Sequence, residues 1–137
     1  MKKLKVAIAG YGIVGKKRHL YINENPNLEI VAISDNNPEQ IAIKDDNILV
    51  YSDYDKMLEL NFDILFVCLV NNVAADATIK GLKKGCHVFC EKPPGMNVKE
   101  IEEVIAVEKE HPDLKLKYGF NHRYHDSVEK ALDIIKS

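Results

Sequence analysis

The chain has 137 residues, of which 46% are hydrophobic and 29% are charged, and its net charge is −2 at pH 7. These values are typical of one soluble globular domain that is long enough to bury a core. Because both signs of charge are spread along the sequence, no basic surface for nucleic acid or anionic lipid is indicated. The apolar stretch after Lys3 is too short for a signal peptide or a membrane span, and we expect a cytoplasmic protein.

Apolar runs of strand length alternate with segments of helical spacing along the whole chain. The predicted strands are residues 4–10, 28–34, 48–52, 62–70, 86–91 and 114–120. The predicted helices are residues 13–25, 36–44, 53–60, 74–85, 98–111 and 126–137. The run at 62–70 is nearly all apolar, as is typical of a central parallel strand with both faces covered. The alternation predicts an α/β fold in a single domain, with a doubly wound parallel sheet and helices on both faces.

A glycine-rich motif of the form G-x-G-x-x-G joins the first predicted strand to the first predicted helix. Its residues are Gly10, Tyr11, Gly12, Ile13, Val14 and Gly15. In such a corner Gly10 allows the tight turn, Gly12 lets the backbone approach a pyrophosphate, and Gly15 lets helix and strand pack closely. The free N–H groups at the start of the helix would then bind the anion. The motif predicts a dinucleotide site of the Rossmann type.

An acidic residue follows the second predicted strand where the motif requires one. Asp35 lies twenty residues after the last motif glycine, where a carboxylate can accept hydrogen bonds from the adenosine ribose hydroxyls. The same carboxylate would repel a 2′-phosphate, and Asn36 and Asn37 offer no arginine to neutralise one. NAD is therefore favoured over NADP, with Lys16 or Lys17 left open as a phosphate partner. The alternative is that the glycines serve only the turn and packing while the acid caps the next helix.

A lysine follows the fifth predicted strand in a proline-rich turn, Glu91-Lys92-Pro93-Pro94-Gly95. In an open parallel sheet, ligands bind at the carboxyl ends of the strands, which places Lys92 beside the nicotinamide end of a dinucleotide. A neutral lysine can take a hydroxyl proton as hydride leaves, and the protonated form can hydrogen-bond the developing carbonyl. The alternative is a surface lysine in a proline turn.

The cysteines carry no recognisable site of their own. Cys68, Cys86 and Cys90 have spacings that fit no zinc or redox motif, and we interpret them as small buried side chains. His122 and His125 flank Arg123 and are interpreted as solvated loop residues, with contact to a sugar or phosphate as the alternative. No cluster has metal-ligand spacing, and no metal is expected.

Four motifs occur in order along almost the whole chain: GYGIVG, an acid after the second strand, CEKPPG and GFNHRY. Together they resemble the N-terminal half of the Gfo/Idh/MocA oxidoreductase family. By that resemblance Lys92 is the catalytic lysine, and Glu91 and Pro93 belong to the same motif. The resemblance also implies that Asn121 and Arg123 border the nicotinamide and the substrate.

The loop after the fourth predicted strand departs from the family pattern. Members often have Thr-Pro there and a histidine a few residues later, whereas this chain has Leu69, Val70 and Asn71, with Ala74 where the histidine would fall. We expect backbone atoms of this loop to line the cofactor site.

The length of the chain is a second departure, because family members continue into another α/β domain that supplies most of the substrate pocket. We expect residues 1–123 to form the NAD(P)-binding Rossmann domain and residues 124–137 to form a connector helix toward a missing C-terminal domain. The resemblance also implies a homo-oligomer for the longer protein.

The resemblance implies an NAD(P)-dependent dehydrogenase that acts on a hydroxyl of a sugar, sugar derivative or nucleotide sugar. The alternative is a dinucleotide-binding or sensing module without catalysis. The candidate substrate residues are Lys92 and Arg123. The candidate cofactor-binding residues are Gly10, Tyr11, Gly12, Ile13, Val14, Gly15, Asp35, Asn36, Leu69, Val70, Asn71, Glu91, Lys92, Pro93 and Asn121. Neither a membrane nor a nucleic-acid partner is expected.

Overall fold

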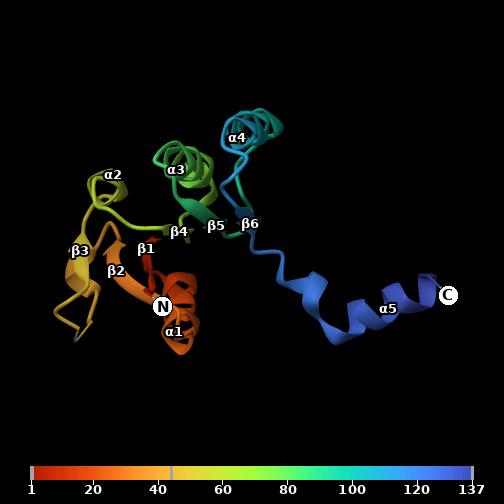
Figure 1. The fold of residues 1–137 in the computed structure, drawn as a ribbon, viewed down its shortest axis with the longest axis horizontal. Helices are drawn as coiled ribbons and strands as arrows, with labels where there is room; N and C mark the ends of the chain where they lie inside the picture. The colour runs from red at the N-terminus through yellow and green to blue at the C-terminus, as the bar shows by residue number, and fades with distance from the viewer. Residues whose placement is uncertain (1, 44, 137) are drawn as a thin grey trace.

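A computed structural model describes residues 2–43 and 45–136 of the chain. Its centre is a six-stranded sheet with the strand order β3-β2-β1-β4-β5-β6, in which every recorded pairing is parallel (Figure 1). The strands are β1 (Leu4–Ala9), β2 (Leu28–Ser34), β3 (Leu49–Tyr51), β4 (Ile64–Val67), β5 (His87–Cys90) and β6 (Leu116–Tyr118). The predicted fold class is confirmed.

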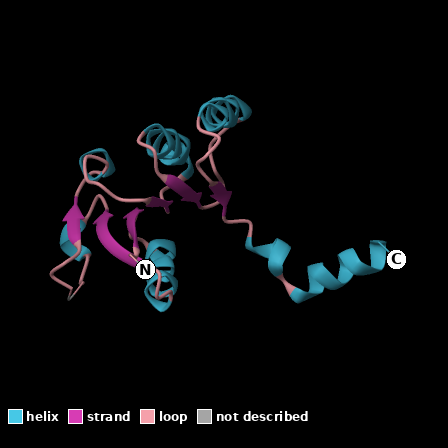
Figure 2. Cartoon of the chain, viewed as in Figure 1, coloured by secondary structure: helices cyan, strands magenta, loops and turns pink. Residues whose placement is uncertain are grey.

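Helices cover both faces of this sheet, with α2, α3 and α4 on one side and α1 on the other (Figure 2). The helices are α1 (Ile13–Glu24), α2 (Tyr54–Met57), α3 (Asn71–Lys83), α4 (Val98–Glu110) and α5 (Asp126–Lys136), with single 3₁₀ turns at η1 (Pro38–Gln40) and η2 (Asn121–Tyr124). Strand order reverses at β1, which lies between β2 and β4. The carboxyl ends of β1 and β4 therefore border the crevice where ligands bind in such sheets.

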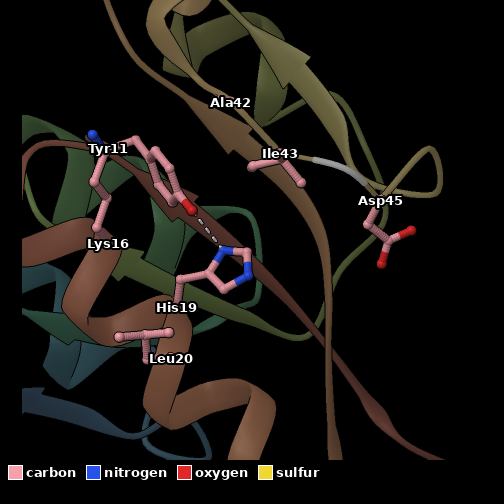
Figure 3. A pocket seen from close by; sticks show the side chains of 7 residues that line it. All are labelled: Tyr11, Lys16, His19, Leu20, Ala42, Ile43 and Asp45. Carbon is pink, nitrogen blue, oxygen red and sulfur yellow. Dashed lines mark hydrogen bonds between the residues drawn. The ribbon is translucent and has the colours of Figure 1, made fainter.

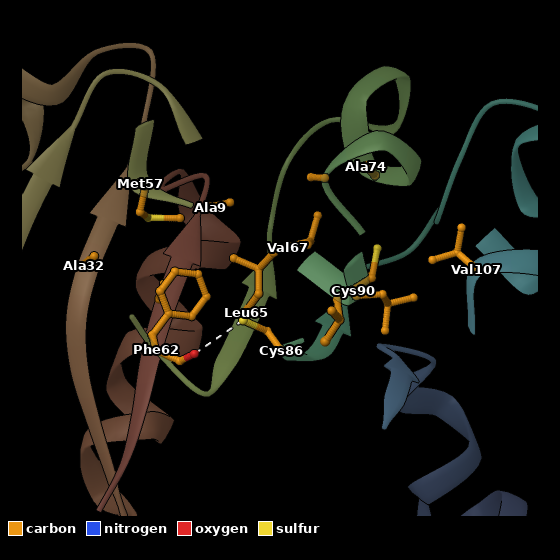
Figure 4. Packing of buried hydrophobic residues seen from close by; sticks show 14 residues of the cluster. Ala9, Ala32, Met57, Phe62, Leu65, Val67, Ala74, Cys86, Cys90 and Val107 are labelled. Atoms are coloured by element: carbon orange, nitrogen blue, oxygen red, sulfur yellow. Dashed lines mark hydrogen bonds between the residues drawn. The ribbon is translucent and has the colours of Figure 1, made fainter. Parts of the chain in front are cut away.

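The core has one cluster on each face of the sheet. On the α3 and α4 side, Leu65 and Val67 of β4 are fully buried with Cys90 of β5 (Figure 4). On the α1 side, Ile8 and Ile33 pack with their neighbours beneath the helix. Apolar side chains removed from water in this way supply the main driving force for folding.

β1 is buried on both faces, and β4 is fully buried on one face and partly buried on the other. All of Val6–Ala9 is inaccessible to solvent, whereas Ile64 and Phe66 of β4 are partly buried and pack against the cluster on the α1 side. The 62–70 run contains the central parallel strand that its apolar sequence predicts, between β1 and β5. Its second face is covered incompletely because α1 packs mainly on β1 and β2.

Two predicted element boundaries also differ from the structure. The helix predicted at 36–44 is reduced to the 3₁₀ turn η1, because Ile41 and Ile43 both pack against the α1-side cluster. Side chains two residues apart share a face in extended chain and not in a helix. The helix predicted to start at Ala74 starts at Asn71, directly after the extended residue Val70.

The last helix extends away from the sheet (Figure 1). Its Leu132, Ile134 and Ile135 side chains are 44%, 68% and 78% exposed. None of the helices described is both long enough and apolar enough to cross a membrane.

Candidate functional site

Two glycines of the motif are required by the packing of the β1–α1 corner. Gly10 has a φ of +89°, and a Cβ there would lie 2.5 Å from the carbonyl oxygen of Cys68. A Cβ on Gly15 would lie 2.1 Å from the carbonyl oxygen of Gly10. Real Cβ atoms do not approach backbone oxygens this closely. The crossing of α1 over the end of β1 therefore depends on both glycines.

The middle glycine has no such reason inside the protein. Gly12 precedes α1 with a φ of −69°, and a Cβ built on it would meet no atom within 4 Å. It is exposed at the end of the helix where the backbone N–H groups lack helical partners. The space that a side chain would fill is open, and it lies where the helix favours an anion.

The carboxylate of Asp35 is held in place by two backbone N–H groups. Tyr11 N–H donates to Oδ2 at 2.7 Å, and Asn37 N–H donates to Oδ1 at 3.0 Å. Each carboxylate oxygen retains a lone pair that can accept a further hydrogen bond. A pocket of about 200 Å³ opens beside this group, lined by Gly10, Gly12, Asp35, Asn36, Cys68, Leu69 and Val70. The structure thus brings the predicted acid to the glycine motif.

A second pocket, which we call the Lys92 pocket, continues from the first along the carboxyl edge of the sheet. Its volume is about 280 Å³, and it is lined by Val14, Lys17, Arg18, Cys68, Leu69, Glu91, Lys92 and Asn121. Cys68 and Leu69 line both pockets. Lys92 follows β5 and has a cis peptide bond to Pro93. Pro93 and the exposed Arg123 are not among the residues that line this pocket.

Residues 4–120 match a family described as an oxidoreductase family with an NAD-binding Rossmann fold, Gfo/Idh/MocA. The chain belongs to this family. Its relatives include D-glucoside 3-dehydrogenase of Escherichia coli, which is 36% identical over 126 residues, or 88% of this chain and 36% of that protein. Inositol 2-dehydrogenase/D-chiro-inositol 3-dehydrogenase of Lactiplantibacillus plantarum is 31% identical over 127 residues, again 88% of this chain and 36% of the relative.

Solved structures of Gfo/Idh/MocA proteins agree with the fold. Scyllo-inositol dehydrogenase from Lactobacillus casei, crystallised with NAD(H) and scyllo-inositol, matches with a TM-score of 0.90 and 28% identity over 98% of this chain and 41% of that one. The chain therefore spans about two fifths of the length of these relatives. Residues 4–120 thus correspond to the NAD-binding Rossmann domain of this family.

Arg18 and Cys68 line the Lys92 pocket but were not among the predicted site residues, and Arg18 has the more important contact. It lies one turn into α1 beyond Gly15, and its guanidinium contacts Glu91, 73 positions away in the sequence. No local pattern marks this arginine, because its partner is reached only when α1 packs beside the end of β5.

A further pocket, which we call the Tyr11–His19 groove, lies between α1 and the segment that carries Ala42, Ile43 and Asp45 (Figure 3). Its volume is about 500 Å³, and it is lined by Tyr11, Lys16, His19, Leu20, Ala42, Ile43 and Asp45. The hydroxyl of Tyr11 lies 2.9 Å from Nδ1 of His19. Burial lowers the pKa of His19, and the Asp45 carboxylate opposes that shift. Tyr11 therefore contacts His19 through its hydroxyl and Asp35 through its backbone N–H, so it links this groove to the glycine corner.

Metal binding has no support in the side-chain arrangement. Within residues 2–43 and 45–136, no group of three His, Cys, Asp or Glu side chains lies close enough together to hold an ion.

Cys68 between the two pockets is a neutral thiol at physiological pH. Burial raises the pKa of Cys68 from 9.0 to about 12, with the Glu91 charge raising it and Arg18 lowering it. A thiol needs its ionised form to act as a nucleophile, so the raised pKa disfavours Cys68 as a nucleophile at neutral pH.

This pKa predicts a loss of stability in alkali. A raised folded-state pKa contributes stability that is complete below pH 9 and is lost as pH rises toward 12. We expect the free energy of unfolding in urea to be roughly 2 kcal/mol lower at pH 10.5 than at pH 8 from this thiol alone. In Cys68→Ala the fall should be smaller by that amount. Equal falls in the two proteins would contradict the assignment.

Proposed function

We propose that this chain holds NAD along the carboxyl edge of the sheet and supplies the catalytic lysine of a dehydrogenase. The open space at Gly12 is the observation that carries the proposal, because no contact within the fold explains a glycine there. A pyrophosphate seated on the bare backbone would use the unpaired N–H groups at the start of α1.

The rest of the cofactor is accommodated by the two pockets on either side. Asp35 is placed to accept hydrogen bonds from the adenosine ribose, and its charge favours NAD over NADP. The pocket at the adenosine end is also lined by Asn36, Leu69 and Val70. Asn71 follows Val70 directly in the chain. The nicotinamide belongs in the Lys92 pocket, with Asn121 on its wall. Tyr11, Ile13 and Val14 complete the glycine corner, and Glu91 and Pro93 frame the lysine.

Lys92 is the group that moves a proton. NAD, when bound, supplies a hydride acceptor. The neutral amine of Lys92 accepts the proton of the substrate hydroxyl, and the resulting ammonium hydrogen-bonds the carbonyl oxygen that forms. In the reverse direction the same side chain returns the proton. Arg123, exposed on η2, is proposed to contact substrate from outside the pocket.

The substrate class follows from the relatives, whose names describe action on glucosides and inositols. We propose a hydroxyl of a sugar, sugar derivative or nucleotide sugar. Residues 1–123 would form the cofactor domain and residues 124–137 a connector, in keeping with the exposed apolar side chains of α5. A cytoplasmic location and self-association of a longer protein stay predictions.

The test is NAD binding by Gly12→Ala, measured by titration calorimetry. The added methyl group would occupy the pyrophosphate position, so we expect at least a tenfold loss of affinity. That loss corresponds to about 1.4 kcal/mol. Because the methyl meets no protein atom, the free energy of unfolding should change by less than about 1 kcal/mol. Unchanged affinity in this variant would reject the proposed cofactor position.

A further inference from the structure

A buried ion pair ties α1 to the end of β5, next to Lys92. The Nε of Arg18 donates to Oε1 of Glu91 at 2.6 Å, and a second guanidinium nitrogen makes a close ion pair with the same oxygen. Glu91 is only 8% exposed. Since a buried carboxylate without a partner is costly, Arg18 is needed wherever Glu91 is buried and charged.

The other side of the carboxylate is confined by β6. A Cβ on Gly119 would lie 2.6 Å from Oε2 of Glu91, so the carboxylate fills the space that this glycine leaves. The backbone N–H of Glu91 donates to Val67 of β4 at 2.9 Å. Glu91 follows β5 and contacts the ends of β4 and β6 as well as α1. The next residue in the chain is Lys92.

The guanidinium of Arg18 makes two further contacts. It lies over the ring of Phe89, 4.7 Å from the centroid, and its NH2 group donates to Oδ1 of Asn121 at 3.3 Å. Because Oδ1 accepts from Arg18, the Nδ2 hydrogens of Asn121 are the ones left to donate toward a ligand in the pocket. One side chain therefore joins α1, β5 and η2, which border the Lys92 pocket together with the segment that follows β4.

We propose that Arg18 is a positioning residue for the nicotinamide end of the cofactor. Through Glu91 it sets the distance of the Lys92 turn from α1, and through Asn121 it sets which end of the amide faces the ligand. Lysine is a poor substitute, because only the planar guanidinium can bind Oε1 of Glu91 and Oδ1 of Asn121 while it stacks on Phe89. The inference rests on the proposed function, since it assumes that this pocket takes the nicotinamide ring.

The experiment compares two ligands that differ only at that end. NADH and ADP-ribose share the adenosine and the pyrophosphate, but ADP-ribose lacks the nicotinamide. Wild-type protein is expected to bind NADH more tightly than ADP-ribose. In Arg18→Met we expect the NADH affinity to fall at least fivefold and the ADP-ribose affinity to change less than twofold, both measured by calorimetry.

Two further variants keep the test decisive if Arg18→Met fails to fold. The double variant Arg18→Met with Glu91→Gln removes both charges of the pair, and it should show the same selective loss of NADH affinity. Lys16→Met is the matched control, because it removes one positive charge from the same helix on the side of the Tyr11–His19 groove. Its ratio of the two affinities should equal that of wild type.

A purely structural arginine would give a different result. If the variants weaken both ligands equally, or lower only the free energy of unfolding, the positioning role is wrong. Equal affinity of wild type for the two ligands would also overturn it. Wild-type protein that binds neither ligand would reject the proposed function, and the inference with it.

Discussion

Lys92→Met is expected to lower kcat for hydroxyl oxidation by about 10²–10⁴, the range that one positioned proton-transfer group contributes. Methionine keeps the length of the side chain but cannot accept or donate the proton. The Kd for NAD should change by less than about threefold, because the glycine corner and Asp35 are untouched. NADH formation, followed by absorbance, measures the first quantity and calorimetry the second. The assay needs the longest polypeptide that the gene encodes, since the relatives are more than twice as long.

Two controls separate proton transfer from charge. Lys92→Arg keeps the positive charge but does not give up its proton near neutral pH, so it should be about as inactive as Lys92→Met. Lys99→Met removes an exposed lysine on α4 that lines none of the pockets described, and it should retain full activity. Full turnover in Lys92→Met would reject the catalytic role. NAD binding without turnover in any of these proteins would favour the non-catalytic module instead.

Gly15→Ala is expected to destabilise the domain by at least about 3 kcal/mol. Alanine normally stabilises a helix interior relative to glycine by roughly 1 kcal/mol, so the expected sign is the reverse of the usual one. The reason is the 2.1 Å separation between the added Cβ and the carbonyl oxygen of Gly10. Both atoms are fixed to backbone, and relief requires α1 to move off the end of β1. Overpacking of this kind costs typically 1–3 kcal/mol and occasionally more.

Urea unfolding followed by circular dichroism measures this effect. The matched control is Asn23→Ala, an exposed position near the end of the same helix, which should be neutral or slightly stabilising. A Gly15→Ala protein as stable as wild type would contradict the close packing at this corner. Together with Gly12→Ala, the experiment separates a glycine that the fold needs from one that the ligand needs.

Much of this molecule was predictable because the relevant signals are local. Apolar runs and glycine positions predicted the six parallel strands and the β1–α1 corner. The motif order from GYGIVG to GFNHRY predicted the family that the comparisons confirm. The start of α2 is also set locally, because the side chain of Asp53 accepts the N–H of Asp55. Each strand, turn, motif and helix cap depends on residues that are close together in the chain, so a short stretch of sequence is enough to predict it.

The features that only the tertiary structure decided are contacts between segments that lie far apart in the sequence. The helix predicted for Ile41 and Ile43 does not form because both side chains pack against the α1-side cluster, and Phe66 is only partly buried because α1 packs mainly on β1 and β2. Arg18 meets Glu91 only after the chain has passed through four more strands, β2 to β5, and through the helices α2 and α3. Periodicity and turn chemistry are properties of a short segment, whereas such contacts depend on how the crossovers place one segment against another.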